Sequence, residues 1–183
     1  TYLESMGEDR QVGAPIPEEL DYNFWVGPAP WSPYCPARLH YKWRGHRDFG
    51  GGGIMDWTGH QIDIAHWGAG LDRTGPVEIE GRGVPYPEPW SAFNQYWFTC
   101  RYANGIELKA SHEIRFGTRW IGDKGSLFVF RGALEADPPE ILDEEIGPDE
   151  IKLYKSTNHH RNFIDCVLNR KTTISPAEVA HRS

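Results

Sequence analysis

Two carboxylates and one imidazole recur at helical spacing within a single short segment. His60 follows Asp56 by four residues and Asp63 follows His60 by three, so at about 100° per residue the three fall on one stripe of a helix. At a spacing of four, a carboxylate can orient an imidazole and raise its basicity. Such a pair in a cleft is suited to taking a proton from a hydroxyl group, which makes Asp56 and His60 our candidate catalytic residues. The alternative explanation is an Asp–His pair that only satisfies its own hydrogen bonds in a core.

A basic and aromatic cluster lies just before this segment. It consists of His40, Trp43, Arg44, His46 and Arg47. Such side chains can stack on and hydrogen-bond to a polyhydroxylated molecule, although a solvated loop has the same composition. We take His40, Trp43 and Arg44, together with Asp63, as candidate substrate contacts.

The same helix offers oxygen and nitrogen atoms that a metal ion could use. The possible ligands are Asp56, His60, Asp63 and His66. His66, however, lies about 80° from the centre of the stripe on a helical wheel. The spacing fits a metal site only in part, and we expect no metal ion here.

The element that must carry these residues is a helix. Four successive glycines at 50–53 predict a permissive turn, and the proline-free segment after them predicts a helix from about residue 54 to residue 67, stopped by Gly68 and Gly70. Apolar residues flank the acidic stripe on both sides, which predicts that the stripe turns inward and that Thr58, Gln61 and Ala65 form the back of the helix. Polar groups buried in this way need mutual hydrogen bonds or a ligand-filled cleft.

The glycine run does not predict a phosphate-binding loop. No β-rich apolar strand leads into it, and no acidic residue follows at the distance expected on a second strand. We expect this chain alone to bind no dinucleotide.

The remaining segments predict a domain dominated by antiparallel strands. Six prolines and five aromatic residues within 13–38 predict an irregular strap pinned against the domain. Residues with period two between 76 and 131 predict strands, joined by tight turns at 103–105 and 122–125. The acidic segment 132–151 is expected at the surface. Helices are expected at 162–169 and after Ser175, with Ser175 as N-cap and Glu178 in the capping box.

These elements divide the chain into four parts of one substrate-binding and oligomerisation domain, residues 1–183. The parts are the strap at 1–49, the active-site helix at 50–70, the sheet at 76–131 and the C-terminal helices at 159–183. The chain begins without Met and its last helix has hardly begun at Ser183. We therefore expect further residues at both ends.

Composition narrows the class of protein. A formal net charge of -7 without any basic run argues against a nucleic-acid binder, and no apolar segment approaches the roughly 20 residues that span a bilayer. The three cysteines, Cys35, Cys100 and Cys166, lie far apart and lack the spacing of a zinc site. We expect reduced thiols, and hence a cytoplasmic protein without nucleic-acid or membrane partners.

Four segments together resemble successive blocks of the C-terminal domain of Gfo/Idh/MocA oxidoreductases, the glucose–fructose oxidoreductase and inositol dehydrogenase type. The segments follow the family's order over most of the chain: LDYNFWVGPA at 20–29, GGGIMDWTGHQID at 51–63, IGDKG at 121–125 and HHRNFID at 159–165. The resemblance implies an α+β fold, in which a mainly antiparallel open sheet carries helices on one face, as in the C-terminal domain of glyceraldehyde-3-phosphate dehydrogenase.

The resemblance also implies a function. In the family's GG-x-x-x-D-x-x-x-H motif, Asp56 and His60 would be catalytic or substrate-orienting residues, and Asp63 matches the downstream acidic position. NAD or NADP would be bound by a Rossmann domain of the parent protein, which this chain lacks. The chain would then be the substrate-binding half of an oxidoreductase acting on a sugar, polyol or glycoside hydroxyl, inactive alone, with copies associating as a homo-oligomer through the open face of the sheet.

Two other classes of function stay open at this point. One is a cofactor-free carbohydrate-binding or assembly module that kept the sheet and the cleft. The other is a hydrolase or lyase that uses the Asp56 and His60 stripe, with or without a metal ion.

Overall fold

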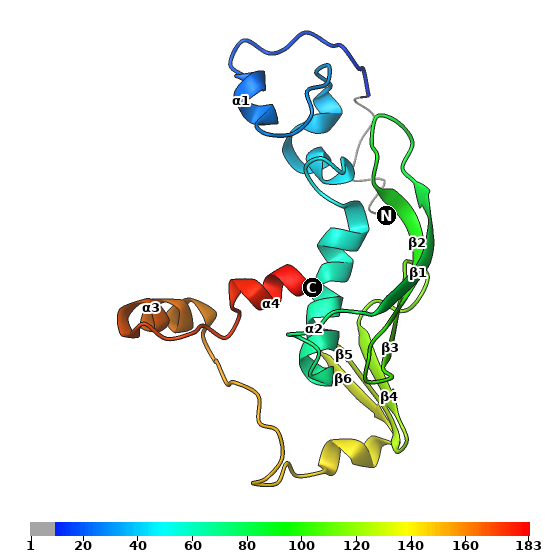
Figure 1. The fold of residues 1–183 in the computed structure, drawn as a ribbon, viewed down its shortest axis with the longest axis vertical. Helices are drawn as coiled ribbons and strands as arrows, with labels where there is room; N and C mark the ends of the chain where they lie inside the picture. The colour runs from blue at the N-terminus through cyan, green and yellow to red at the C-terminus, as the bar shows by residue number, and fades with distance from the viewer. Residues whose placement is uncertain (1–9) are drawn as a thin grey trace. The chain divides into compact units, whose positions relative to one another are not determined.

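The computed structural model describes residues 10–183, which separate into two units (Figure 1). The first unit contains the described residues up to His60 together with Pro76–Ile114. The second contains Gln61–Gly75 and Arg115–Ser183. None of the helices within residues 10–183 is both long enough and apolar enough to cross a membrane.

The N-terminal segment of the first unit is irregular but packed. Its short helix α1 (Tyr22–Val26) is capped by the Asp21 side chain, which accepts a hydrogen bond from the amide of Phe24 at 3.0 Å. Prolines on both sides keep this helix short, as expected. Two buried clusters hold the segment in place: Tyr22, Val26 and Tyr34 in one, and Cys35, Ala37, Tyr86, Trp90 and Ala92 in the other.

The sheet of the first unit is an antiparallel meander in the order β1-β2-β3. Its strands are β1 (Glu78–Pro85), β2 (Phe93–Arg101) and β3 (Glu107–Ser111). The predicted turn between β2 and β3 is confirmed. Gly105 has a φ of 87° there, and the Asn104 side chain accepts a hydrogen bond from the amide of Ile106.

The second unit contains a separate antiparallel meander in the order β4-β5-β6. Its strands are β4 (Thr118–Gly122), β5 (Gly125–Phe130) and β6 (Ala133–Asp137). Gly122 pairs with Gly125, so the predicted tight turn at 122–125 is confirmed. The expected surface position of residues 132–151 is confirmed, since none of them is buried, but strand β6, which pairs with β5, was not predicted.

The segment that carries the candidate residues changes helix type along its length. A 3₁₀ helix, His40–Gly45, precedes the glycine run, and a π-helical turn, Ile54–Thr58, leads into α2 (Gly59–Ala69). The predicted helix and its glycine stop are confirmed, since α2 ends before Gly70, which has a φ of 67°. The π-helical turn was not predicted.

Two short helices follow in the second unit. Helix α3 (His159–Asn169) begins earlier than predicted because Asn158 serves as its N-cap, and α4 (Ala177–Arg182) follows. Ser175 is not the N-cap of α4, which begins after Pro176 without a side-chain cap. Pro176 takes the capping place with an extended backbone, so the predicted capping box does not form.

The architecture confirms the predicted α+β class with mainly antiparallel sheets, here as two three-stranded sheets. All three cysteines are buried. Burial raises the pKa of the Cys100 thiol, which keeps it protonated.

Candidate functional site

Arg44 is held against two aromatic rings by the geometry of its helix. In a 3₁₀ helix residues three apart eclipse each other, and the guanidinium carbon of Arg44 lies 4.3 Å from the centre of the Tyr41 ring. The same carbon lies 4.8 Å from the centre of the Trp43 ring. These contacts are cation–π interactions, which fix the position of the planar guanidinium group.

Asp56 meets Arg44 from the π-helical turn. The Arg44 Nε lies 3.2 Å from Asp56 Oδ2, and the two side chains are 30% and 29% exposed. A half-exposed ion pair of this kind orients both groups without a large desolvation cost. The structure thus brings together two residues that were predicted separately, one as a catalytic and one as a substrate-binding residue.

His60 lies on the first turn of α2 and is exposed. Its ring centre is 6.2 Å from that of Trp57, with the planes tilted by 59°. Trp57 is itself 38% exposed. The imidazole is therefore accessible to a ligand, with an aromatic surface beside it.

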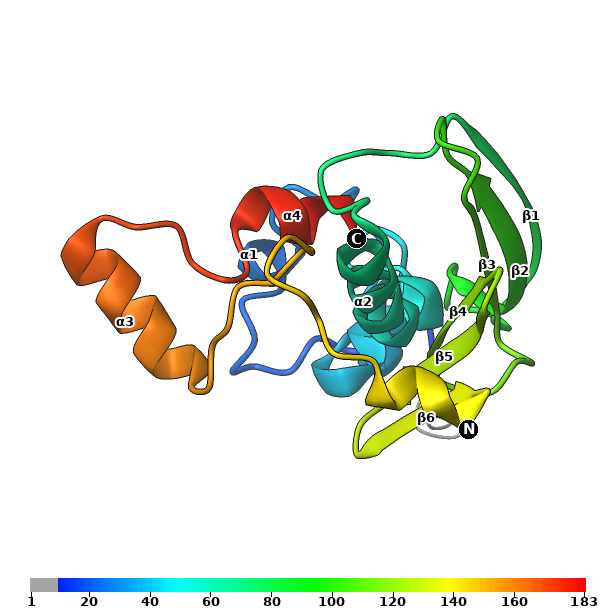
Figure 2. The ribbon, with the colours of Figure 1, turned by 90° about the horizontal axis from the view of Figure 1, so that it is seen from below.

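The prediction that the acidic stripe turns inward is wrong. The supposed back of the helix is the packed face: Thr58 is buried and hydrogen-bonds to Tyr96 in the first unit. In the second unit, the carbonyl oxygens of Gln61 and Ala65 accept hydrogen bonds from Thr118 at 2.9 Å and from Trp120 at 3.4 Å. Figure 2 shows α2 beside β4.

The physical reason for this reversal is residue size. Gly68, which has no side chain, lets the helix approach Trp120 closely, whereas the apolar Met55 is 69% exposed. A helical wheel built on hydrophobicity alone selects the wrong face in such a case. The π-helical turn also has more residues per turn than an α-helix, which displaces Asp56 from the stripe.

The remaining residues of interest are Asp63, His40 and His46. Asp63 belongs to the second unit, where it accepts a hydrogen bond from the Ser183 hydroxyl at 2.9 Å. His40 is exposed at the start of its 3₁₀ helix, with a φ of 50°. His46 is buried, with Nε2 3.0 Å from the carbonyl oxygen of Ala37. It therefore serves packing, and burial lowers the pKa of its imidazole.

No group of three or more His, Cys, Asp or Glu side chains within residues 10–183 is arranged to hold a metal ion. Asp56, His60, Asp63 and His66 share a helical segment but form no such cluster.

The glycine run does not form a cradle for dinucleotide phosphates. A Cβ placed on Gly50 would lie 2.9 Å from the Trp43 ring, and one placed on Gly52 would lie 2.9 Å from the Cβ of Ala92. These glycines thus make room for the protein's own side chains, whereas a phosphate loop turns its amides toward a ligand. The glycine run therefore does not fit the pyrophosphate of NAD or NADP.

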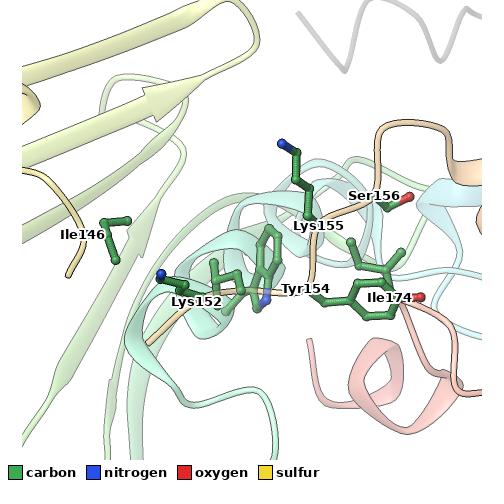
Figure 3. Close-up of a pocket in the computed structure, with 8 residues that line it drawn as sticks. Ile146, Lys152, Tyr154, Lys155, Ser156 and Ile174 are labelled. Carbon is green, nitrogen blue, oxygen red and sulfur yellow. The ribbon is translucent and has the colours of Figure 1, made fainter. Parts of the chain in front are cut away.

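A separate open hollow of about 500 Å³ lies in the second unit. It is lined by Trp67, Ile146, Lys152, Leu153, Tyr154, Lys155, Ser156 and Ile174. Tyr154 and Ile174 lie next to each other in it, whereas Lys155 extends away from them (Figure 3). Neither Asp56 nor His60 lines this hollow.

The sequence did not single out Tyr41, although it completes the surroundings of Arg44. The available signal was an aromatic residue three positions before an arginine. This signal depends on the helix type, because the two side chains stack only if the turn is helical.

The whole chain was also compared with known proteins. Residues 3–183 match the model of an oxidoreductase family's C-terminal alpha/beta domain, the Gfo/Idh/MocA type. A search among curated proteins finds no match. Since the family model covers almost the entire sequence and agrees with the antiparallel α+β architecture, the chain belongs to the Gfo/Idh/MocA oxidoreductase family, of which it is the C-terminal alpha/beta domain.

Proposed function

We propose that this domain is the substrate-binding half of an NAD(P)-dependent oxidoreductase that acts on a hydroxyl group of a sugar, polyol or glycoside. The family membership supports the reaction class. The observation that carries the assignment to a site is the exposed imidazole of His60 four residues after Asp56, whose carboxylate holds Arg44.

His60 accepts the proton of the substrate hydroxyl in this proposal. Its exposure leaves the imidazole open to a substrate, and Trp57 beside it offers a ring for stacking on the apolar face of a sugar. Asp56 positions Arg44, which binds the substrate together with Trp43 and His40. The orientation of His60 by Asp56 stays a prediction, as does the contribution of Asp63 to substrate binding.

Oxidation of a hydroxyl-bearing carbon also needs a hydride acceptor, which a nicotinamide dinucleotide supplies when it is bound. The space beside the glycines at 50–53 is occupied by the chain's own side chains. We propose that the dinucleotide is bound outside this domain and that the domain alone is inactive.

Association of copies through the open face of the sheet also stays a proposal. On β1–β3, Arg101 forms ion pairs with Glu78 and Glu107 at 2.7 and 3.0 Å. Charges of both signs on one surface suit a self-complementary contact between identical subunits.

The proposed base is tested by His60→Ala in the full-length polypeptide that carries this chain. We expect turnover to fall by about 10²-fold or more, because a positioned base contributes at least this much, and we expect the melting temperature to stay unchanged because His60 is exposed. The control is His181→Ala, which removes an exposed imidazole from α4. Unchanged turnover of the His60 variant would refute the proposal that His60 is the base.

A further inference from the structure

We infer that Arg44 binds a carboxylate of the substrate, so that the substrate is an acidic sugar such as a uronic acid. This inference rests on the proposed function, because it assigns the substrate class of the same site. It follows from the geometry of the guanidinium group and from the packing of the glycine run.

The Arg44 side chain is 30% exposed and part of its guanidinium group is engaged by the protein. Its Nε forms an ion pair with Asp56 Oδ2 at 3.2 Å, and Nη1 is 3.4 Å from the carbonyl oxygen of Tyr41, a long contact. Nη2 makes no hydrogen bond with any residue from 10 to 183. The Nη1 and Nη2 edge of an arginine matches the two oxygens of a carboxylate, which it binds through two parallel N–H···O bonds.

The Arg44 side chain is also held in place before any ligand arrives. The rings of Tyr41 and Trp43 contact its plane, and Asp56 fixes its inner edge. A flexible arginine loses side-chain entropy when it binds, whereas one that is already ordered loses less. Asp56 therefore acts as a positioning residue for Arg44.

A carboxylate fits this site better than a phosphate. Phosphate sites usually rely on backbone amides of glycine-rich loops or helix N-termini, and here Gly50 and Gly52 pack against Trp43 and Ala92. A neutral hydroxyl would use one N–H group and leave the charge unmatched. The exposed ring of Tyr41, 42% accessible, lies beside the guanidinium and can contact the carbon skeleton of a sugar acid.

The test measures binding of matched sugar pairs to the full-length polypeptide by isothermal titration calorimetry. The pairs are glucose and glucuronate, galactose and galacturonate, and mannose and mannuronate, with glucose 6-phosphate as the phosphate probe. We expect at least one acid to bind about tenfold or more tightly than its neutral partner, because a charged bidentate contact is gained. We expect Arg44→Gln to bring that ratio close to one.

Two further variants separate recognition from folding. Arg44→Lys keeps the positive charge but loses the two parallel N–H donors of the guanidinium group. We expect it to lower the preference for the acid several-fold. Arg82→Gln is the matched control, because Arg82 also stacks on a tryptophan, Trp97, at 4.8 Å but lies on β1. Its preference should equal that of the wild type. If Arg44→Gln does not fold, the Lys variant decides the question.

Each other outcome contradicts a defined part of the argument. If acids and neutral sugars bind equally and Arg44→Gln weakens both equally, then Arg44 does not recognise a substrate carboxylate. The proposed function stays intact in that case. If glucose 6-phosphate binds more tightly than any acid, then Arg44 recognises a phosphate group and the proposed carboxylate is wrong. Absence of binding for every sugar and acid overturns both the inference and the proposed function.

Discussion

Two buried histidines illustrate what single residues contribute to this molecule. His46 is 2% exposed, and both its Nε2 and the indole nitrogen of Trp90 lie within hydrogen-bonding distance of the Ala37 carbonyl oxygen, at 3.0 and 3.2 Å. His66 is 3% exposed on α2. Burial lowers the pKa of both imidazoles, and the charge of Arg38 lowers that of His46 further. The folded state therefore favours their neutral forms.

Stability should decrease in mild acid as a result. The pKa of each buried imidazole lies below its ordinary value of 6.5, so the unfolded chain binds protons first as the pH falls through that value. The free energy of unfolding then decreases by at most about 1.4 kcal/mol per pH unit for each histidine. Urea denaturation between pH 8 and pH 5 measures this slope.

His46→Gln serves as the control for that slope. The variant keeps a donor for the Ala37 carbonyl but has no titrating group, so its stability should depend less steeply on pH than that of the wild type. A wild-type free energy of unfolding that stays level down to pH 5 would contradict the neutral, buried state of these histidines.

Among the elements, α2 depends most on close approach to its sheet. A Cβ placed on Gly68 would lie 2.6 Å from the Trp120 ring, whose nitrogen donates to the carbonyl oxygen of Ala65. At Gly59, by contrast, nothing lies within 4 Å of such an atom. The two glycines of one helix thus differ in what a methyl group would meet.

This difference gives a paired prediction. Gly68→Ala should destabilise the protein by about 1–3 kcal/mol, because the methyl group forces Trp120 or the helix to move. Gly59→Ala should stabilise it by up to about 1 kcal/mol, because alanine is the better helix former. Denaturant titrations of both variants measure the two changes, and equal effects would contradict the described contact between α2 and β4.

The elements also show what can be predicted from sequence. The turns at 103–105 and 122–125 depend on Asn and Gly chemistry within the turn itself, so they were predicted at the correct positions. The packed face of α2 depends on partners distant in sequence, Thr118 and Trp120, and was predicted wrongly. Strand β6 was not predicted, although its hairpin partner β5 is adjacent in sequence. Arg44 was selected from the sequence as a candidate substrate contact, but its pairing with Asp56 involves the π-helical turn, which no local pattern indicated.

For the whole chain, the glycine run before α2 bears on where a cofactor could bind. Its glycines accommodate Trp43 and Ala92. In the function that we propose, this domain supplies the substrate side of the reaction.

Dinucleotide binding by the 183-residue chain alone should therefore be absent. We expect calorimetric titrations with NADH and NADPH to give no saturable signal up to millimolar concentrations, since Gly50 and Gly52 pack against the chain's own Trp43 and Ala92. Full-length polypeptide titrated in parallel is the positive control. Micromolar affinity for the chain alone would contradict the assignment of this domain.

The burial of all three cysteines has a practical consequence for labelling. Segment 1–9 contains no cysteine, so a maleimide reagent meets only shielded sulfur atoms while the units stay closed. A cysteine introduced at the β4–β5 turn, for example Lys124→Cys at a side chain 83% exposed, would then receive a fluorophore selectively. The rate at which the native thiols are modified would in turn report how fast the surroundings of each cysteine open.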